Sequence, residues 1–219
     1  MDLKEAMYAR HTVRKYKEDN LRSDVVNLLN EKVEAINKEN DLSIKLMVNE
    51  THSIMGIAKV LMTKNVKNYF IMAGDDIEKT CESLGYYGAY LMLLSQTLGL
   101  NTWWVGGMFN RSVSKYVDNK KVIGIIAVGY GEDQGVQHKM GKTFDDVVEK
   151  DSETTEWFKQ GVKAALYAPT AMNAQDFKFS LKGNKVKAEG KKGSFGETDL
   201  GIAKYHFELG AGKENFEWE

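Results

Sequence analysis

Apolar residues recur along the first forty positions with the spacing of helices. Residues 2–9 carry them three and four positions apart, which predicts a short helix with an inner face of Leu3, Ala6 and Met7. A second helix is predicted from Ser23, as N-cap, to the polar segment Asn37–Asp41. The apolar stripe of this helix comprises Val26, Leu29, Val33 and Ile36.

The segment Cys81–Gly99 has the strongest helical pattern in the chain. Gly99 suits the position just after a helix, where a left-handed backbone is common. Small residues inside the segment predict that another backbone packs closely against it; they are Gly85, Gly88 and Ala89. One apolar face comprises Leu84, Tyr87, Leu91, Leu94 and Leu98.

Short apolar runs bounded by polar turns predict strands elsewhere. Ser43–Val48 and Tyr69–Met72 have the length and the β-branched or aromatic content of buried strands, and Met55–Leu61 between them is predicted to be helical. Val122–Gly129 is apolar throughout, which is typical of a strand covered on both faces.

The last third of the chain mixes both patterns. A helix is predicted over Asp151–Tyr167, a hairpin over Phe177–Leu181 and Lys185–Glu189 with Gly183-Asn184 at its turn, and a further helix over Asp199–Leu209. The order of elements indicates an α+β fold. Helix, polar break and short strand occur at Val25–Val48 and again at Trp157–Leu181, which suggests a partial duplication.

Composition narrows the class of protein. Thirty basic and thirty-one acidic residues among 219 give a formal charge of −1, so we expect neither nucleic acid nor an anionic membrane as partner. The single cysteine, Cys81, and four scattered histidines offer no metal-ligand spacing. The charged N-terminus and the lack of a long apolar stretch favour a cytoplasmic location.

Three segments could bind a ligand, although each also has an ordinary structural interpretation. Arg10–Tyr16 gathers cations that suit a phosphate, or it is a solvated turn. Pro169–Gln175 crowds small and amide side chains around the one proline, or it simply ends a helix. Gly99–Gly107 ends in a glycine pair that lets a flat ligand approach the backbone, or its tryptophans belong to the core.

Taken together, these segments resemble the FMN-dependent nitroreductase family, in a branch with rearranged segment order. RHTVR at 10–14, LGLNTWWVGG at 98–107, HKMGK at 138–142 and APTAMNAQDF at 168–177 are similar to that family's flavin-binding motifs. The resemblance implies a nitroreductase-like fold, with a central, mostly antiparallel mixed sheet flanked by helices. The FMN-binding residues that it implies are Arg10, His11, Thr12, Arg14, Val105, Gly106, Gly107, Lys139, Lys142, Pro169, Thr170, Ala171, Met172, Asn173 and Gln175.

The chain departs from the family pattern at two positions. Gly141 stands where an arginine is usual, and Asp176-Phe177 replaces Pro-Trp. The proline-asparagine motif also comes late in the chain. We therefore expect residues 1–150 to form a nitroreductase-like half with the phosphate motif and residues 151–219 a partial second half, packed as one unit that acts as a pseudo-dimeric monomer, with a homodimer as the alternative.

The resemblance implies an oxidoreductase that takes hydride from NADH or NADPH onto bound FMN and passes electrons to a nitroaromatic, a quinone or a similar small molecule. No side chain is expected to be catalytic, because the resemblance implies that the chemistry takes place on FMN. Two other functions stay open: a module that stores or senses FMN without turnover, and a purely structural protein. Cys81 is expected to be a packed residue, and His52, His138 and His206 to be surface or capping residues.

Overall fold

The computed structural model describes residues 1–55, 62–75, 77–136 and 141–219. The chain divides into two units, and each is assembled from separate stretches of sequence. Unit 1 contains Ala9–Thr80 and Leu91–Gln137, and unit 2 contains Asp2–Tyr8, Cys81–Tyr90 and His138–Glu219. The sequence led us to expect two halves of a partial internal repeat, residues 1–150 and 151–219. The two units do not test that expectation, which stays a prediction.

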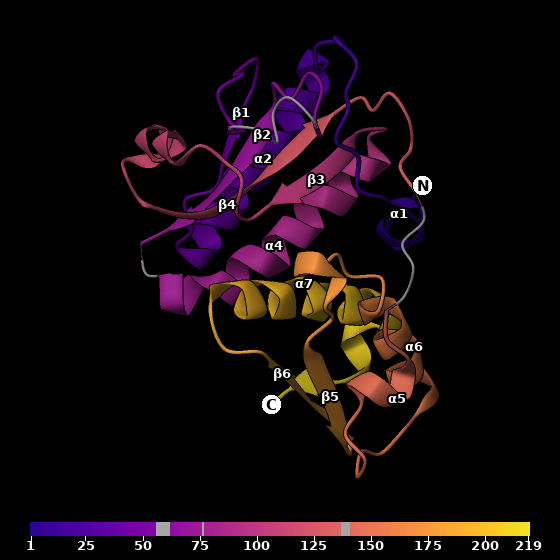
Figure 1. Cartoon of the computed structure of the whole chain (residues 1–219). Coiled ribbons are helices and arrows are strands. Elements are labelled where there is room, and N and C mark those ends of the chain that lie inside the picture. The colour runs from indigo at the N-terminus through magenta and orange to yellow at the C-terminus, as the bar shows by residue number, and fades with distance from the viewer. Residues whose placement is uncertain (56–61, 76, 137–140) are drawn as a thin grey trace. The chain divides into compact units, whose positions relative to one another are not determined.

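Unit 1 is built on a four-stranded sheet in the order β1-β2-β4-β3, in which all neighbours are antiparallel (Figure 1). Its strands are β1 (Lys45–Met47), β2 (Tyr69–Gly74), β3 (Asn101–Val105) and β4 (Lys121–Gly129). Every residue of β2 is buried, which explains the continuous apolar run in its sequence. Three of the strands confirm the predicted runs, whereas β3 was expected only as a ligand-binding segment.

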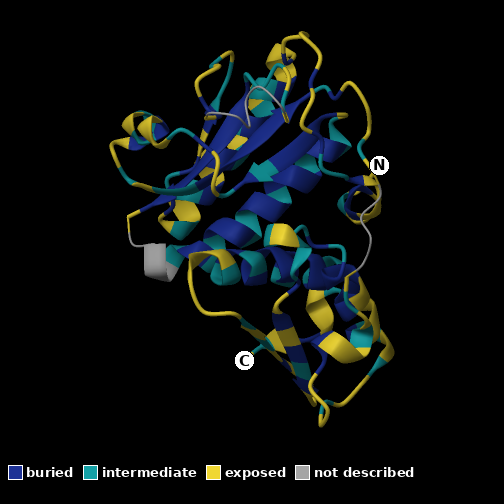
Figure 2. Cartoon of the chain, in the orientation of Figure 1, coloured by how far each residue is buried: buried dark blue, intermediate teal, exposed yellow. Residues whose placement is uncertain are grey.

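One face of this sheet carries a large hydrophobic cluster of unit 1. Side chains two residues apart on each strand point to the same side, and the loop before α2 contributes Val13 and Tyr16 to the cluster. Figure 2 shows the strands of this sheet largely in the colour of buried residues. The buried strand residues of the cluster are Tyr69, Ile71, Ala73, Trp103, Val105, Ile125 and Ala127.

The helices of unit 1 largely agree with the predicted pattern. α2 (Ser23–Asn40) is followed by its C-cap Asp41, whose backbone is left-handed with φ 52°. Its N-cap is Arg22 and not Ser23. Val25 is buried where Val26 was expected, so the buried stripe is Val25, Leu29, Val33 and Ile36, whose spacing of three and four residues also suits one helix face. A 3-10 helix, η1 (Arg111–Val117), follows β3. α4 (Ile77–Thr97) starts before Cys81, and Gly99 beyond it has φ 78°, as its position predicts.

Unit 2 combines helices with a three-stranded sheet in the order β5-β6-β7. β5 and β6 form the predicted hairpin, with φ 63° at Gly183, and β7 pairs in parallel with β6. The strands are β5 (Phe177–Lys182), β6 (Lys185–Gly190) and β7 (Glu217–Trp218). The helices are α1 (Leu3–Ala9), whose last residue belongs to unit 1, α5 (Phe144–Val147), α6 (Glu156–Ala165), η2 (Ala171–Asn173), α7 (Ser194–Ala211) and η3 (Lys213–Asn215).

The expected helix over Asp151–Tyr167 is wrong at its start. Thr155 is the N-cap of α6, and its Oγ1 accepts a hydrogen bond from the Phe158 amide at 3.3 Å. Because that threonine satisfies one of the free amides of the first turn, the helix begins at Glu156. The predicted helix Met55–Leu61 falls largely outside the described residues.

The segment 81–90 of α4 crosses α7 within unit 2 at two glycines. A Cβ on Gly85 would lie 2.0 Å from the Thr198 carbonyl oxygen, and a Cβ on Gly201 would lie 1.9 Å from the Glu82 carbonyl oxygen. Both distances are far below van der Waals contact, so only glycine lets the helix backbones approach this closely. The close packing predicted at Gly85 is confirmed.

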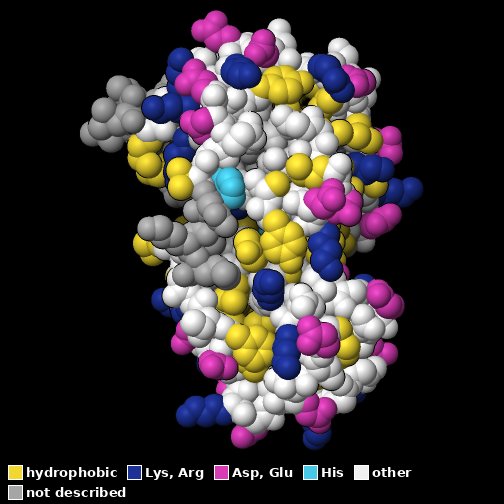
Figure 3. All heavy atoms as spheres, turned by 90° about the vertical axis from the view of Figure 1, so that its right-hand side faces the viewer, with side chains coloured by type: hydrophobic (Ala, Val, Ile, Leu, Met, Phe, Trp, Pro, Cys, Tyr) yellow, Lys and Arg dark blue, Asp and Glu magenta, His cyan; other side chains and the backbone are white. Residues whose placement is uncertain are grey.

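None of the helices in the described part of the chain combines the length and apolar composition needed to cross a bilayer. On the face drawn in Figure 3, acidic and basic side chains are interspersed among polar and apolar ones.

The helices and the mainly antiparallel strands of the two units define an α+β fold, as the sequence predicts.

Candidate functional site

The predicted phosphate-binding segment, Arg10–Arg14, lies alongside β3 in unit 1. Thr12 forms a parallel bridge with Thr102, and the Val13 amide donates to the Thr102 carbonyl at 3.2 Å. Two residues further on, the Tyr16 hydroxyl donates to the Val13 carbonyl at 2.7 Å, inside the core. These contacts fix a polar segment against a strand, although it forms no regular element of its own.

Arg10 and His11 hold buried nitrogen atoms in this segment. Arg10 is only 6% exposed, and its Nε atom and His11 Nδ1 have no hydrogen-bond partner among the described residues. Burial lowers the pKa of Arg10 to about 10, so the guanidinium stays charged at neutral pH. Burial and then the Arg10 charge lower the pKa of His11, which keeps its imidazole neutral there. A buried donor without a partner, such as Arg10 Nε, is costly, and an anionic ligand would satisfy it.

Arg14 presents a second cation on the same segment. Its guanidinium carbon lies 5.2 Å from the centre of the Trp103 ring, in a cation–π contact, and the residue is exposed. Its planar donors are therefore accessible to a ligand beside β3.

The glycine pair follows β3 directly, so the two motifs of unit 1 share one strand. At about 3.3 Å per residue, Gly106 lies about 13 Å beyond Thr102, comparable with the length of an extended mononucleotide. A Cβ on Gly107 would meet nothing described within 4 Å, and its amide donates to no described backbone or side chain. The chain after β3 thus leaves backbone accessible at Gly107, whereas Val105 is 2% exposed and belongs to the core of unit 1. That Val105, Gly106 and Gly107 bind FMN stays a prediction.

The predicted proline-asparagine segment forms a tight, left-handed turn in unit 2. Met172, Asn173 and Gln175 have φ values of 52°, 57° and 49°, a conformation that costs a non-glycine residue roughly 1 kcal/mol or more. Met172 is 99% exposed, whereas Gln175 is fully buried. Strain of this kind is retained where surrounding contacts and function require it.

Hydrogen bonds from several elements hold this turn. Thr170 Oγ1 accepts from the Gln175 amide at 3.0 Å, and Gln175 Nε2 donates to the Leu166 carbonyl at 2.6 Å. Gln175 Oε1 also accepts from the Lys142 amide at 3.2 Å. Gln175 therefore ties the turn to α6 and to the segment before α5, a structural role that its motif alone did not reveal.

Asp199, on α7, is a site residue that the sequence did not indicate. Its two carboxylate oxygens accept from the Ala171 amide at 3.1 and 2.9 Å, 28 residues away in the chain. Burial, with a smaller contribution from Asp176, raises the pKa of this carboxyl to about 7, while the Ala171 bond acts in the opposite direction. The folded protein thus binds this proton more tightly than the unfolded chain, so ionisation of Asp199 lowers stability as pH rises from about 4 to about 7.

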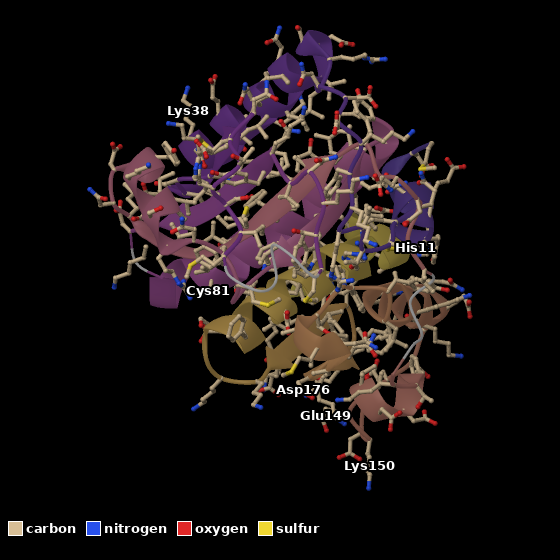
Figure 4. All side chains as sticks on the ribbon, turned by 45° about the horizontal axis from the view of Figure 1, so that its top comes forward. His11, Lys38, Cys81, Glu149, Lys150 and Asp176 are labelled. Atoms are coloured by element: carbon tan, nitrogen blue, oxygen red, sulfur yellow. The ribbon has the colours of Figure 1, made fainter. Side chains whose placement is uncertain are left out.

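The two departures from the family pattern meet in space. Lys142 Nζ lies 3.1 Å from Asp176 Oδ1, and a Cβ on Gly141 would lie 3.4 Å from Asn173 Nδ2. Asp176, labelled in Figure 4, directly precedes β5. The carboxylate that replaces the usual proline therefore pairs with a lysine expected to bind phosphate, while Lys139 falls outside the described residues.

We expect Asp176→Asn to strengthen phosphate binding by freeing Lys142. Exposed ion pairs contribute little to stability, so the affinity for FMN should rise about two- to fivefold at low salt, corresponding to about 0.5–1 kcal/mol. The gain should disappear at about 0.5 M salt. Fluorescence titration measures it, and Glu189→Gln, which breaks the exposed Lys187–Glu189 pair, is the matched control. Unchanged affinity in the Asp176 variant at low salt would mean that Lys142 has no part in binding.

Three further titratable side chains, Cys81, His52 and His206, lie outside the predicted flavin motifs. Cys81, labelled in Figure 4, is buried at the start of the unit 2 part of α4, and burial raises the pKa of its thiol, which disfavours a nucleophile. His52 is exposed, as expected. His206 was expected at the surface but is 1% exposed, and its Nδ1 lies 2.8 Å from the Ile202 carbonyl, because it is on the inner face of α7. The described residues contain no cluster suited to a metal ion.

The predicted site residues thus form two groups. Unit 1 brings together Arg10, His11, Thr12, Arg14, Val105, Gly106 and Gly107, and unit 2 brings together Lys142 and Pro169–Gln175. That all of them bind FMN stays a prediction.

The sheet and the glycine-ended strand define a protein of the nitroreductase-like α+β class, and structural comparison supports this class. A "putative nitroreductase" of Thermotoga maritima superposes with a TM-score of 0.68 at 21% identity, covering 98% of this chain and 85% of that one. The chain belongs to the family described as "Putative TM nitroreductase", whose model matches residues 2–211.

Two further solved structures share the fold over part of the chain. An "FMN-dependent Nitroreductase" of Clostridium difficile gives a TM-score of 0.52 at 13% identity, covering 68% of this chain and 98% of that one. A "Putative NADH dehydrogenase/NAD(P)H nitroreductase" of Bacteroides thetaiotaomicron gives 0.50 at 17% identity, covering 68% and 96%. The comparison with curated proteins gave no match.

Proposed function

We propose that this protein is an FMN-dependent oxidoreductase that accepts hydride from NADH or NADPH and reduces a small organic acceptor such as a nitroaromatic or a quinone. The observation that carries the proposal is the arrangement in unit 1, where the segment with buried Arg10 and exposed Arg14 is hydrogen-bonded to β3, the strand that directly precedes Gly106-Gly107. Family membership and the names of two structural relatives, one FMN-dependent and one an NAD(P)H nitroreductase, support it.

The residues of unit 1 suit an anionic, flat cofactor. Arg10 keeps its charge in a buried position and has an unpaired donor atom, so it would hold a phosphate with little screening by water. Arg14 would add a second cation from the Trp103 side. At the far end of β3, the missing side chain of Gly107 would leave backbone next to a ring system, where its amide can donate.

Bound FMN would supply the hydride and electron chemistry, and the protein would orient the ring and the phosphate. Neutral His11 has one donor and one acceptor nitrogen, so it would hydrogen-bond to the cofactor without adding charge. The left-handed turn at Pro169–Gln175 would take part in FMN binding through its backbone and Asn173.

The decisive experiment is spectroscopic. We expect the purified protein to be yellow, to release FMN on denaturation, and to bleach on anaerobic addition of NADH or NADPH, with colour restored by a quinone or a nitroaromatic. A yellow protein that neither nicotinamide reduces would instead be an FMN storage or sensing module. Protein that takes up no FMN would exclude both functions.

A further inference from the structure

Asp199 is a buried acid that the proposed chemistry does not use. Among the described residues, its hydrogen bonds come from one donor, the Ala171 amide, which both of its oxygens accept. An ionised carboxylate in such surroundings is costly, because one amide replaces only part of the water that would otherwise solvate it. A group that destabilises the folded protein in this way is kept where it has a structural or functional role.

The position of the bond indicates that task. Ala171 begins η2, and the next residues, Met172 and Asn173, adopt left-handed φ values. Within the turn, the Asn173 amide donates to the Thr170 carbonyl at 3.0 Å and the Ala174 amide to the Ala171 carbonyl at 3.0 Å. Asp199 therefore anchors the first residue of a strained turn to α7, a helix of 18 residues.

The charges around Asp199 leave its carboxylate uncompensated. Asp176, before β5, repels it and is itself paired with Lys142. On α4, Glu82 is paired with Lys204 of α7, and Glu197 lies on α7 two residues earlier. Among the described residues, Asp176 is the one charged side chain that contributes to the shift at Asp199. No described cation offsets the charge of the Asp199 carboxylate. The hydrogen bond from the Ala171 amide is therefore the main contact that the ionised carboxylate strengthens.

We propose that Asp199 is a positioning residue that holds the 170–175 turn in its FMN-binding conformation, most firmly when its carboxylate is ionised. This inference rests on the proposed function, in that the turn takes part in FMN binding. It goes further by assigning a role to a residue outside every flavin motif. Protonation weakens the acceptor and releases the turn, so the affinity for FMN falls as Asp199 takes up its proton.

The test compares wild type with Asp199→Asn, Asp199→Ala and the control Glu197→Gln, which removes a neighbouring α7 carboxylate that does not bond the turn. FMN dissociation constants are measured by fluorescence at pH 6 and pH 8. Each variant's constant is divided by that of wild type at the same pH, so that titration of the ligand's own phosphate cancels. We expect the ratio for Asp199→Asn to be near 1 at pH 6 and about 5–10 at pH 8, since a charged acceptor is roughly twice as strong as a neutral one.

A second readout needs no cofactor. In ligand-free protein at pH 8, hydrogen exchange of a peptide spanning 167–177 should be faster in Asp199→Ala than in wild type or Glu197→Gln. Asp199→Asn keeps an oxygen that accepts from Ala171, so it tests the charge if the alanine variant fails to fold. Thermal unfolding of wild type should also lose more stability between pH 5 and pH 8 than that of Asp199→Asn.

The outcomes separate the two ideas. If wild type binds FMN and both Asp199 variants bind it equally well at pH 8, or if the ratio is the same at both pH values, the positioning role is wrong while the proposed function stands. If wild type binds no FMN, the proposed function fails, and the hydrogen exchange of the peptide spanning 167–177 still decides whether Asp199 holds the turn. Equal exchange in all variants overturns the inference.

Discussion

Replacing Gly201 with alanine is expected to destabilise the protein by about 3 kcal/mol and to lower its melting temperature by about 6–10 °C. The new Cβ would lie 1.9 Å from the Glu82 carbonyl oxygen and 2.8 Å from the Tyr86 amide nitrogen. Both are backbone atoms of α4, so no side-chain rotation relieves the clash and the helices must separate. Alanine favours helix by about 1 kcal/mol over glycine, which offsets only part of this loss.

Gly85→Ala should behave in the same way, because its Cβ would lie 2.0 Å from the Thr198 carbonyl oxygen of α7. The two changes open the same helix crossing, so the double variant should lose less stability than the sum of the single variants. Gly107→Ala, with open space around its Cβ, controls for the substitution itself and should unfold like wild type. Thermal denaturation followed by circular dichroism gives these values. Wild-type stability of Gly201→Ala would show that α4 and α7 do not approach this closely.

Replacing Arg14 with alanine is expected to weaken FMN binding roughly 10- to 100-fold, the loss of about 1.5–3 kcal/mol from a charge-assisted hydrogen bond. The side chain is exposed and its contact with Trp103 contributes little to folding, so the free energy of unfolding should change by less than about 1 kcal/mol. Arg14→Lys should recover only part of the affinity, because an ammonium group cannot reproduce the planar donors of the guanidinium. Fluorescence titration and chemical denaturation measure the two effects separately.

Arg111 provides a matched control for this experiment. It is also exposed in unit 1, and its guanidinium carbon lies 4.2 Å from the centre of the Phe109 ring, so it makes the same kind of contact outside the motif. Arg111→Ala should leave FMN affinity unchanged. If both arginine variants lose affinity equally, the effect reflects general charge, and the specific role of Arg14 is contradicted.

The sequence predicted most elements of the fold because their apolar patterns are local. α2, α4 and β4 follow from the spacing of apolar residues over one segment each. β3 was missed as a strand because its residues, including Asn101 and Thr102, mix polar and aromatic side chains, and their burial depends on pairing with β4. The start of α6 depended on one threonine side chain and not on periodicity.

The candidate site was predictable only where it lies in contiguous motifs. Arg10–Arg14 and Val105–Gly107 were both identified, but their common strand became evident from the Thr12–Thr102 bridge. Asp199 carries no motif, and its bond to Ala171 arises from tertiary packing of α7. Asp176 and Gly141 were recognised as departures, whereas the pairing of Asp176 with Lys142 depends on the fold.

Unit 2 is assembled from segments that are far apart in the sequence, and this limits the order in which the chain can fold. Its α1 segment is made first, but the Tyr8 ring packs edge-on against Tyr167, with ring centres 4.8 Å apart, in the last third of the chain. During synthesis α1 must therefore wait until Tyr167, about three quarters of the way along the 219 residues, has been made before it can dock, and a helix of 7 residues is not stable alone. Ala6 and Met7, which are buried in the folded protein, should therefore stay exposed in the nascent chain until Tyr167 has been made.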